Sequence, residues 1–241
     1  MRFIAFLLMS FCMLLPSYSN AETAPETSSS LTILTIGDSR VEGATPDFES
    51  YRFHLWKMLT EASFSVNMIG PLKDPGHYPK LGSLSFDPDH AGVGGFKTTD
   101  VLKHLHVVLD SEEMPDVILV GIGGNDLIES KRRPERIFKN VLTIVERLQD
   151  AFPESDILVE QIAPAKSNLM QNDLRKRFDR FNALVGQTIA QQGTEISQVF
   201  SVDMSLGWSD DYLADAVHYN DKGAVFIASK YFVKIQNLNS R

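Results

Sequence analysis

Short apolar runs alternate with longer amphipathic segments along the chain, and this alternation limits the fold more than any other feature. The apolar runs are rich in Val, Ile and Leu, as buried strands are, and they span residues 31–37, 65–70, 116–121, 156–162 and 196–202. The amphipathic segments have the length and periodicity of helices, and they span residues 51–62, 98–109, 134–151, 169–192 and 222–236. This pattern predicts an α/β fold in which helices cover both faces of a mainly parallel, five-stranded sheet.

The beginning of the chain has the features of a secretory signal peptide. Arg2 precedes an apolar stretch over residues 3–15, and Ser19 and Ala21 have the spacing of small residues before a cleavage point. The stretch is too short to span a bilayer, so we expect no stable membrane insertion after cleavage. The predicted organisation is a signal peptide at 1–21, a flexible polar leader at 22–30 and one domain at 31–241.

Charge and cysteine content narrow the classes of partner. The formal net charge is −8 at pH 7, and no cluster of Lys and Arg offers a track for phosphates, so we expect no nucleic-acid partner. A neutral substrate fits this charge better. The only cysteine, Cys12, lies in the predicted signal peptide, so the domain has no cysteine for a disulfide.

Two groups of metal-ligating residue types are interpreted as ordinary structure. His104 and His106 lie two residues apart on a predicted helix and point in different directions there, so they do not form a zinc pair. Asp87, Asp89 and His90 belong to the run DPDH, which we interpret as a solvated turn rather than a cation site. We therefore expect neither a metal nor an organic cofactor.

The first apolar run ends at Gly37-Asp38-Ser39, where a serine has two interpretations. Ser39 can be the N-cap of the next helix, because its hydroxyl can satisfy an unpaired amide. It can also be a nucleophile, because ligands gather at the carboxyl ends of parallel strands. The G-x-S-x-G elbow of α/β-hydrolases is excluded, since Val41 stands where that motif has its second glycine.

A partner for such a serine occurs near the other end of the chain. In LADAVHYNDKG, Asp215 precedes His218 by three residues. In a turn this spacing puts both side chains on one side, so the carboxylate can orient the imidazole and the imidazole can take the proton of a hydroxyl. The alternative is an aspartate that caps the final helix beside a surface histidine.

Two glycine-rich segments offer donors for an oxygen that gains negative charge. Asn125 follows an apolar run in GIGGND, where its amide can donate, although a tight turn explains the same residues. Gly95, in HAGVGGFKTTDVL, precedes a predicted helix whose first amides are unpaired. A phosphate loop requires glycine directly before Lys97, and Phe96 stands there, which argues against a nucleotide-binding domain.

Together these residues resemble a known family. GDS with Ser39, the loop with Gly95, GxND with Asn125 and DxxH with His218 resemble the four blocks of the SGNH, or GDSL-type, hydrolases, in the family's order. The resemblance implies a flavodoxin-like, three-layer α/β/α sandwich. It also implies that Ser39 is the nucleophile, His218 the base and Asp215 the partner of the base. The implied oxyanion donors are the amides of Ser39 and Gly95 and the side chain of Asn125.

A narrower resemblance suggests the substrate. The segments ESYRFHLWKMLTEASFSVNMIGPL and FDPDHAGVGGFKTTDVL are similar to carbohydrate esterase family three, which includes acetyl xylan esterases. It implies a secreted or periplasmic serine esterase that removes O-acetyl groups from a carbohydrate, with a small-molecule or polysaccharide ester as substrate. Alternatives in the same chemistry are a lysophospholipase, a thioesterase and an arylesterase. An inactive carbohydrate-binding module is the alternative from another class.

Three residues near these motifs bear on the shape of the substrate pocket. Arg40 follows the serine of GDS where the family more usually has an apolar residue, and Tyr219 follows the histidine of DxxH where proline is frequent. Neither departure removes a reacting group. Trp208 lies in the loop SLGWSDDYL and is a candidate for lining a substrate groove, with ordinary packing as its alternative.

Overall fold

The computed structural model describes residues 30–238 of the chain. The predicted signal peptide at 1–21 lies outside the described residues, and so does the predicted leader except for its last residue. That residue, Ser30, already pairs with Ser65 as the first residue of strand β1 (Ser30–Gly37). The first strand therefore begins one residue earlier than the apolar pattern indicates.

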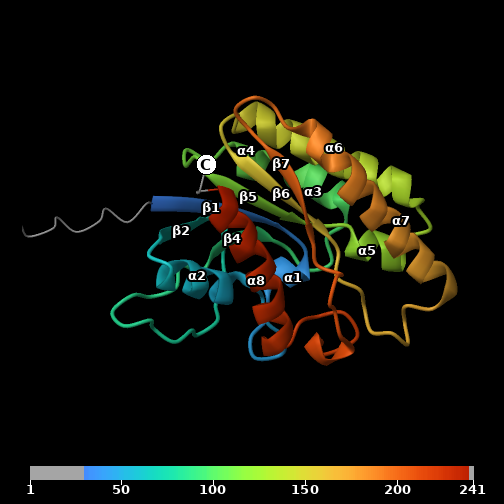
Figure 1. Cartoon of the computed structure of the whole chain (residues 1–241), viewed down its shortest axis with the longest axis horizontal. Coiled ribbons are helices and arrows are strands. Elements are labelled where there is room, and N and C mark those ends of the chain that lie inside the picture. The colour runs from blue at the N-terminus through green and yellow to red at the C-terminus, as the bar shows by residue number, and fades with distance from the viewer. Residues whose placement is uncertain (1–29, 239–241) are drawn as a thin grey trace, which may run out of the picture.

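A sheet of seven strands forms the centre of the described part of the chain (Figure 1). Its other strands are β2 (Ser65–Ile69), β3 (Leu72–Lys73), β4 (Asp89–Gly92), β5 (Val117–Gly121), β6 (Asp156–Gln161) and β7 (Val199–Asp203). The order is β3-β4-β1-β5-β6-β7, and β2 pairs with the first half of β1. Every pair is parallel except the pair of β3 and β4. The predicted α/β fold with a mainly parallel sheet is confirmed.

The predicted number of five strands is wrong, because β3 and β4 carry no apolar run. β4 has the sequence DHAG, and its first residues were expected in a solvated turn. Instead Ala91 and Gly92 pair with the end of β1, and His90 pairs with β3 and is buried. Backbone pairing with an existing strand, rather than apolar periodicity, holds this segment in place.

Helices cover both faces of the sheet (Figure 1). They are α1 (Ser39–Glu42), α2 (Arg52–Glu61), α3 (Thr98–His104), α4 (His106–Leu109), α5 (Gly124–Glu129), α6 (Pro134–Ala151), α7 (Asn172–Thr188) and α8 (Asp221–Leu238), with 3₁₀ turns η1 (Ile189–Gln192) and η2 (Asp210–Tyr212). The helices α2 and α8 pack together on one face, and α3, α6 and α7 pack on the other. Within residues 30–238, none of the helices combines the length and apolar character that crossing a membrane requires.

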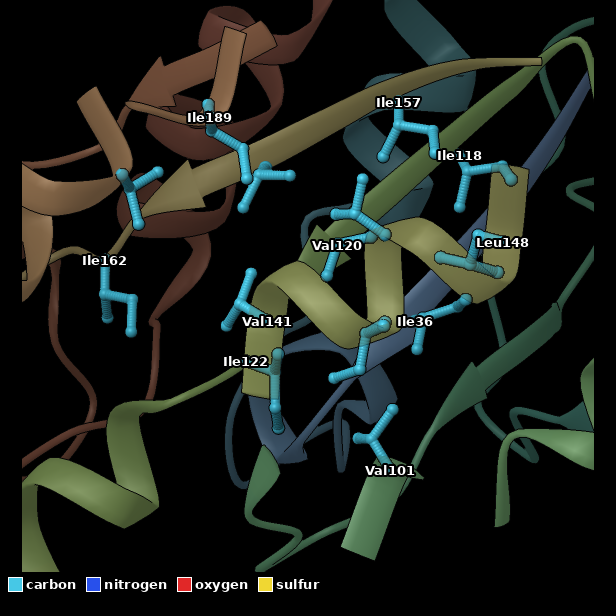
Figure 2. Packing of buried hydrophobic residues seen from close by; sticks show 14 of the residues in the cluster. Ile36, Val101, Ile118, Val120, Ile122, Val141, Leu148, Ile157, Ile162 and Ile189 are labelled. Atoms are coloured by element: carbon cyan, nitrogen blue, oxygen red, sulfur yellow. The ribbon is translucent and has the colours of Figure 1, made fainter. Parts of the chain in front are cut away.

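Alternate residues of the central strands point into two separate hydrophobic clusters, one on each face of the sheet. Leu34 and Ile36 of β1 belong to the cluster under α3, α6 and α7, which Figure 2 shows from close by. Leu31 and Ile33 belong to the cluster under α2 and α8. Because both faces of β1 are buried, its sequence reads as a continuous apolar run rather than an alternating one.

The ends of β1 and β5 approach each other closely. Gly37 and Gly121 are register partners, and a Cβ atom on Gly37 would lie 2.3 Å from the carbonyl oxygen of Gly121. Only glycine fits at this crossing. The chain leaves β1 toward Ser39 and leaves β5 toward Asn125, so both residues emerge at one edge of the sheet, where ligands bind in folds of this kind.

Candidate active site

Ser39 is the first residue of α1, directly after the first strand. The N-cap of this helix is Asp38, whose side chain accepts a hydrogen bond from the amide of Arg40 at 3.0 Å. The interpretation of Ser39 as a cap is therefore wrong, because the preceding aspartate fills that role. The Ser39 hydroxyl instead lies 2.8 Å from Nε2 of His218.

The turn before α8 holds the imidazole of His218 in place. Oδ1 of Asp215 accepts the amides of Val217 and His218, both at 2.8 Å, and Oδ2 lies 2.7 Å from Nδ1 of His218. Desolvation raises the pKa of Asp215, but the hydrogen bonds from the imidazole and the two amides outweigh it and lower the pKa to about 2. Asp215 is therefore ionised at neutral pH and fixes Nδ1 as a donor, which leaves Nε2 to accept from Ser39.

The ring of Phe48 packs flat against this imidazole. The ring centres of Phe48 and His218 are 3.9 Å apart, with an angle of 16° between the planes. The loop that carries Phe48 is bonded to the segment of His218, because the amide of Glu49 donates to the carbonyl of Tyr219 at 2.9 Å. No sequence motif indicates this contact, because it joins two loops that are distant in the chain.

The candidate oxyanion donors lie on two neighbouring loops. Nδ2 of Asn125, in the first turn of α5, donates to the carbonyl of Phe96 at 3.0 Å, so the side chain reaches the loop that contains Gly95. An amide group has two N–H bonds, and the second remains for a ligand. Gly95 has φ +76°, and within residues 30–238 neither its amide nor that of Ser39 has a hydrogen-bond partner.

Asp126 holds the loop of Gly95 in place through hydrogen bonds from Thr98. It is fully buried, and its carboxylate accepts the amide of Thr98 at 2.7 Å and the hydroxyl of Thr98 at 3.0 Å. Burial raises the pKa of Asp126, partly offset by these two hydrogen bonds. The motif GxND therefore does two things: Asn125 faces the site, and Asp126 joins the start of α3 to α5. Sequence reasoning identified only the first.

Arg40 joins the helix of Ser39 to the turn of His218. Its Nε donates to the carbonyl of Val217 at 2.8 Å, and one terminal nitrogen donates to the carbonyl of Ala163 at 2.7 Å. Its guanidinium lies 4.9 Å from the ring centre of Tyr219. The two departures from the family pattern, Arg40 and Tyr219, thus contact each other. Both also make hydrogen bonds that hold the segment around His218 in position.

A small cavity of about 20 Å³ adjoins the Ser39 hydroxyl. Asn125 lines one side, and Ile128, Phe178 and Val217 supply apolar surface. This volume has room for about one water-sized group, such as a methyl group. The cavity therefore has room for the methyl group of an acetyl ester.

Trp208 lies among other aromatic side chains. Its ring centre is 5.3 Å from that of Tyr212, 5.6 Å from that of Tyr219 and 5.7 Å from that of Phe226. These contacts favour the packing interpretation over the groove-lining one. Among residues 30–238 no three His, Cys, Asp or Glu side chains gather as a metal site requires.

Comparison with known proteins agrees with this geometry. The GDSL-like lipase/acylhydrolase family matches residues 35–225. A carbohydrate esterase family 3 structure from Talaromyces cellulolyticus is 26% identical with a TM-score of 0.74, over 86% of this chain and 97% of that one. A mutant acetyl esterase crystallised with an acetate ion is 25% identical with a TM-score of 0.71, over 86% and 97%.

The fold is also shared with the family 3 carbohydrate esterase of Clostridium thermocellum, at 23% identity and a TM-score of 0.70, over 88% of this chain and 98% of that one. No curated protein matches the sequence significantly. The family match covers more than half of the chain, and the structures similar to it include esterases. The chain therefore belongs to the GDSL-like lipase/acylhydrolase family and is a carboxylic ester hydrolase.

Proposed function

We propose that this protein removes O-acetyl groups from a carbohydrate, with Ser39 as the nucleophile. The observation that carries the proposal is the hydrogen-bonded line from Asp215 through His218 to Ser39, which ends beside a cavity of about 20 Å³. The line supplies a hydroxyl that can be activated, and the cavity accepts an acyl group of the size of acetyl. The similarity to a family 3 carbohydrate esterase and to an acetyl esterase supports the carbohydrate and the acetyl group.

The proposed reaction has two steps. In the first, Nε2 of His218 takes the proton of Ser39 as its oxygen attacks the ester carbonyl, and the protonated imidazole gives this proton to the departing sugar hydroxyl. In the second, His218 takes a proton from water, the resulting hydroxide attacks the acetyl-serine, and acetate leaves as Ser39 regains its proton. The ionised Asp215 stabilises the imidazolium in both steps.

The negative charge that develops on the carbonyl oxygen needs donors. The amides of Ser39 and Gly95 and the side chain of Asn125 are the proposed set. The first two amides have no partner among residues 30–238, so they can donate to the oxyanion without breaking an existing hydrogen bond. Such preorganisation lowers the cost of reorganising the site during the reaction.

We also propose that the protein acts outside the cytoplasm, either secreted or in a periplasm. The support is the signal-like sequence at residues 1–21, with Arg2 before the apolar stretch and Ala21 at the expected cleavage point. Expression of the full chain followed by N-terminal sequencing of the exported product tests this. Cleavage after Ala21 is expected, and an uncleaved chain retained in the cells contradicts it.

A substrate panel tests the proposed reaction. Wild type and Ser39→Ala are compared on acetylated xylan, p-nitrophenyl acetate, p-nitrophenyl palmitate and an acyl thioester. We expect wild type to release acetate from xylan and to reject the palmitate ester, because the cavity beside Ser39 is small. Ser39→Ala is expected to lose all turnover while its circular dichroism spectrum stays unchanged.

Each result has a clear meaning. Wild-type turnover by Ser39→Ala removes the nucleophile assignment. Preference for the long-chain or thioester substrate replaces the carbohydrate proposal with the lysophospholipase or thioesterase alternative. Failure of a fluorophosphonate probe to label the folded wild type favours the inactive carbohydrate-binding module.

A further inference from the structure

A second and larger cavity lies at the end of α1, the helix that begins with Ser39. Its volume is about 580 Å³, within the range of ligand sites in proteins. One wall comes from residues 42–46, where α1 ends, and another from residues 73–77, where β3 ends. His90 of β4 also lines the cavity. None of these residues belongs to the catalytic line described above.

The walls of this cavity are held together by Arg52 of α2, whose side chain is fully buried. Arg52 donates to the carbonyls of Val41 and Glu42 at 2.8 Å and to that of Pro88 at 3.0 Å. It also forms a 2.8 Å ion pair with Asp74. A buried guanidinium with all these partners fixes α1 against the segments around β3 and β4, so the cavity is a built feature rather than a gap between mobile loops.

His90 supplies a donor to this cavity. The side chain is buried, and Nδ1 accepts the amide of Gly92 at 3.1 Å, so the ring proton lies on Nε2. Among residues 30–238 no hydrogen-bond partner of Nε2 occurs. Burial, together with the charge of Arg52, lowers the pKa of His90 to about 4, so the ring is neutral at neutral pH. The Nε2 proton is therefore available to a ligand or a water that enters the cavity.

Glu42 connects the cavity to the catalytic site. Its side chain lines the cavity, and Oε2 accepts the amide of Gly94 at 2.7 Å. Gly94 precedes Gly95, and a Cβ atom built on Gly94 would lie 3.9 Å from Cβ of Ser39. A ligand in the cavity that contacts Glu42 is therefore separated from the oxyanion loop by a single side chain.

The chemistry of the lining favours a neutral polyhydroxylated ligand. Sugar hydroxyls both donate and accept, and the cavity offers the His90 N–H as a donor and the Glu42 carboxylate as an acceptor. Ala44, Pro46 and Pro75 add apolar surface for the C–H faces of a sugar ring. The basic side chains near the cavity do not favour an anionic ligand, because each already has a carboxylate partner. Arg52 pairs with Asp74 at 2.8 Å, and Lys73 pairs with Asp89 at 2.9 Å.

We propose that this cavity is a subsite for a sugar residue of the substrate chain, next to the residue whose acetyl ester is cleaved. This proposal rests on the proposed function, because it assigns the place of the carbohydrate relative to Ser39. It makes the enzyme selective for acetyl groups carried on an oligosaccharide over acetyl groups carried on a small alcohol. Remote contacts of this kind raise the rate by positioning the ester for attack.

Binding is tested directly in the inactive Ser39→Ala protein. Xylotetraose, which carries no ester, is titrated in while the imidazole signals of the six histidines are followed by NMR. The His90 signal is identified from its absence in His90→Gln. We expect xylotetraose to shift the His90 signal, and acetate alone to leave it in place. An unchanged His90 signal at saturating xylotetraose overturns the proposal.

Kinetics provide the second test. Ala44→Arg places a long charged side chain in the cavity, and Val233→Arg, on the exposed surface of α8, is the matched control. The measured quantity is the ratio of kcat/KM for acetylated xylotetraose to that for p-nitrophenyl acetate. We expect Ala44→Arg to lower this ratio about tenfold or more, as loss of positioning contacts does, and Val233→Arg to leave it unchanged.

The outcomes separate this inference from the proposed function. An unchanged ratio in Ala44→Arg, with wild type still active on acetylated xylan, overturns the subsite and leaves the proposed function standing. Wild type that is inactive on acetylated xylan contradicts the proposed function, and the NMR titration then decides whether the cavity binds a sugar at all.

Discussion

At the scale of single residues, the structure explains why the serine after the first strand does not cap the next helix. Asp38 accepts the amide at the start of α1, so the hydroxyl of Ser39 remains for His218. Asp38 and Ser39 are neighbours in one motif, and either side chain can cap a helix. Here Asp38 is the cap, and Ser39 contacts His218. The sequence placed Asp38 and Ser39 side by side at the end of the first strand, but it did not reveal that Asp38 is the cap.

Arg40 is expected to act as a positioning residue. Arg40→Met removes the donors to Val217 and Ala163, so the turn of His218 is less well fixed. We expect kcat on p-nitrophenyl acetate to fall about tenfold to a hundredfold with little change in KM, since misplacement by about 1 Å costs on that order. Arg40→Lys keeps one donor and is expected to recover part of kcat. A rise in KM at constant kcat instead indicates that Arg40 contacts the substrate.

Asn125 is expected to stabilise the transition state. Asn125→Ala removes the second amide proton that can donate to the oxyanion, and deletion of one such donor costs about a hundredfold to a thousandfold in kcat. Steady-state kinetics on p-nitrophenyl acetate measure the loss, and the thermal unfolding midpoint serves as the control for folding. A loss below about threefold means that Asn125 only anchors the loop through the carbonyl of Phe96.

At the scale of elements, the loop that carries Gly95 owes its position to the start of α3. Thr98 donates twice to Asp126 and accepts from Nδ2 of Asn140 at 2.8 Å, and all three side chains are buried. This network joins α3, α5 and α6 directly beneath the oxyanion loop. Its members lie in separate parts of the chain, so sequence periodicity cannot reveal it.

Replacing this threonine tests the network. Thr98→Val keeps the shape but leaves Asn140 without its acceptor and Asp126 without one of its donors. We expect the free energy of unfolding to fall by about 1–3 kcal/mol, the cost of a buried unsatisfied group. Urea denaturation measures it, with Thr143→Val on the exposed side of α6 as the control. Equal effects of the two substitutions contradict the role of the network.

Strands that are buried on both faces could be predicted from the sequence, whereas strands held mainly by backbone pairing could not. β1 and β5 are buried on both faces and were evident as apolar runs, because burial dictates their composition. β3 and β4 depend on pairing with neighbouring strands, and their residues, LK and DHAG, carry no periodicity. Likewise the spacing of Asp215 and His218 is local and was readable, whereas the contact of Phe48 with His218 exists only after folding.

At the scale of the whole molecule, the buried Glu160 makes stability depend on pH. It lies at the end of β6 and accepts the hydroxyl of Tyr231 at 2.7 Å. Burial raises the pKa of Glu160 to about 7, although the hydrogen bond from Tyr231 and the charge of Arg40 oppose the shift. In the unfolded chain this pKa is near its usual value of about 4.3, so the native state holds a proton that the unfolded state releases.

The contribution of Glu160 to stability therefore falls as the pH rises. The stability contributed by Glu160 is fully present below about pH 4.3 and is lost as the pH rises through about 7, by about 4 kcal/mol in total. His90 acts in the opposite direction, because its lowered pKa reduces stability as the pH falls. We therefore compare Glu160→Gln with wild type by thermal unfolding at pH 5 and pH 8. The measured quantity is the unfolding temperature of Glu160→Gln minus that of wild type. We expect this difference to be more positive at pH 8 than at pH 5, and an equal difference at the two pH values contradicts the raised pKa of Glu160.

The two side chains of the proposed nucleophile and base meet in space but lie far apart in the sequence, since Ser39 and His218 are 179 positions apart. The proposed nucleophile is therefore synthesised early in translation, whereas the proposed base is synthesised only with the last residues before α8. A nascent or truncated polypeptide that stops short of that helix has no means of deprotonating the serine. Hydrolysis by this route consequently requires a chain synthesised at least as far as the turn before α8.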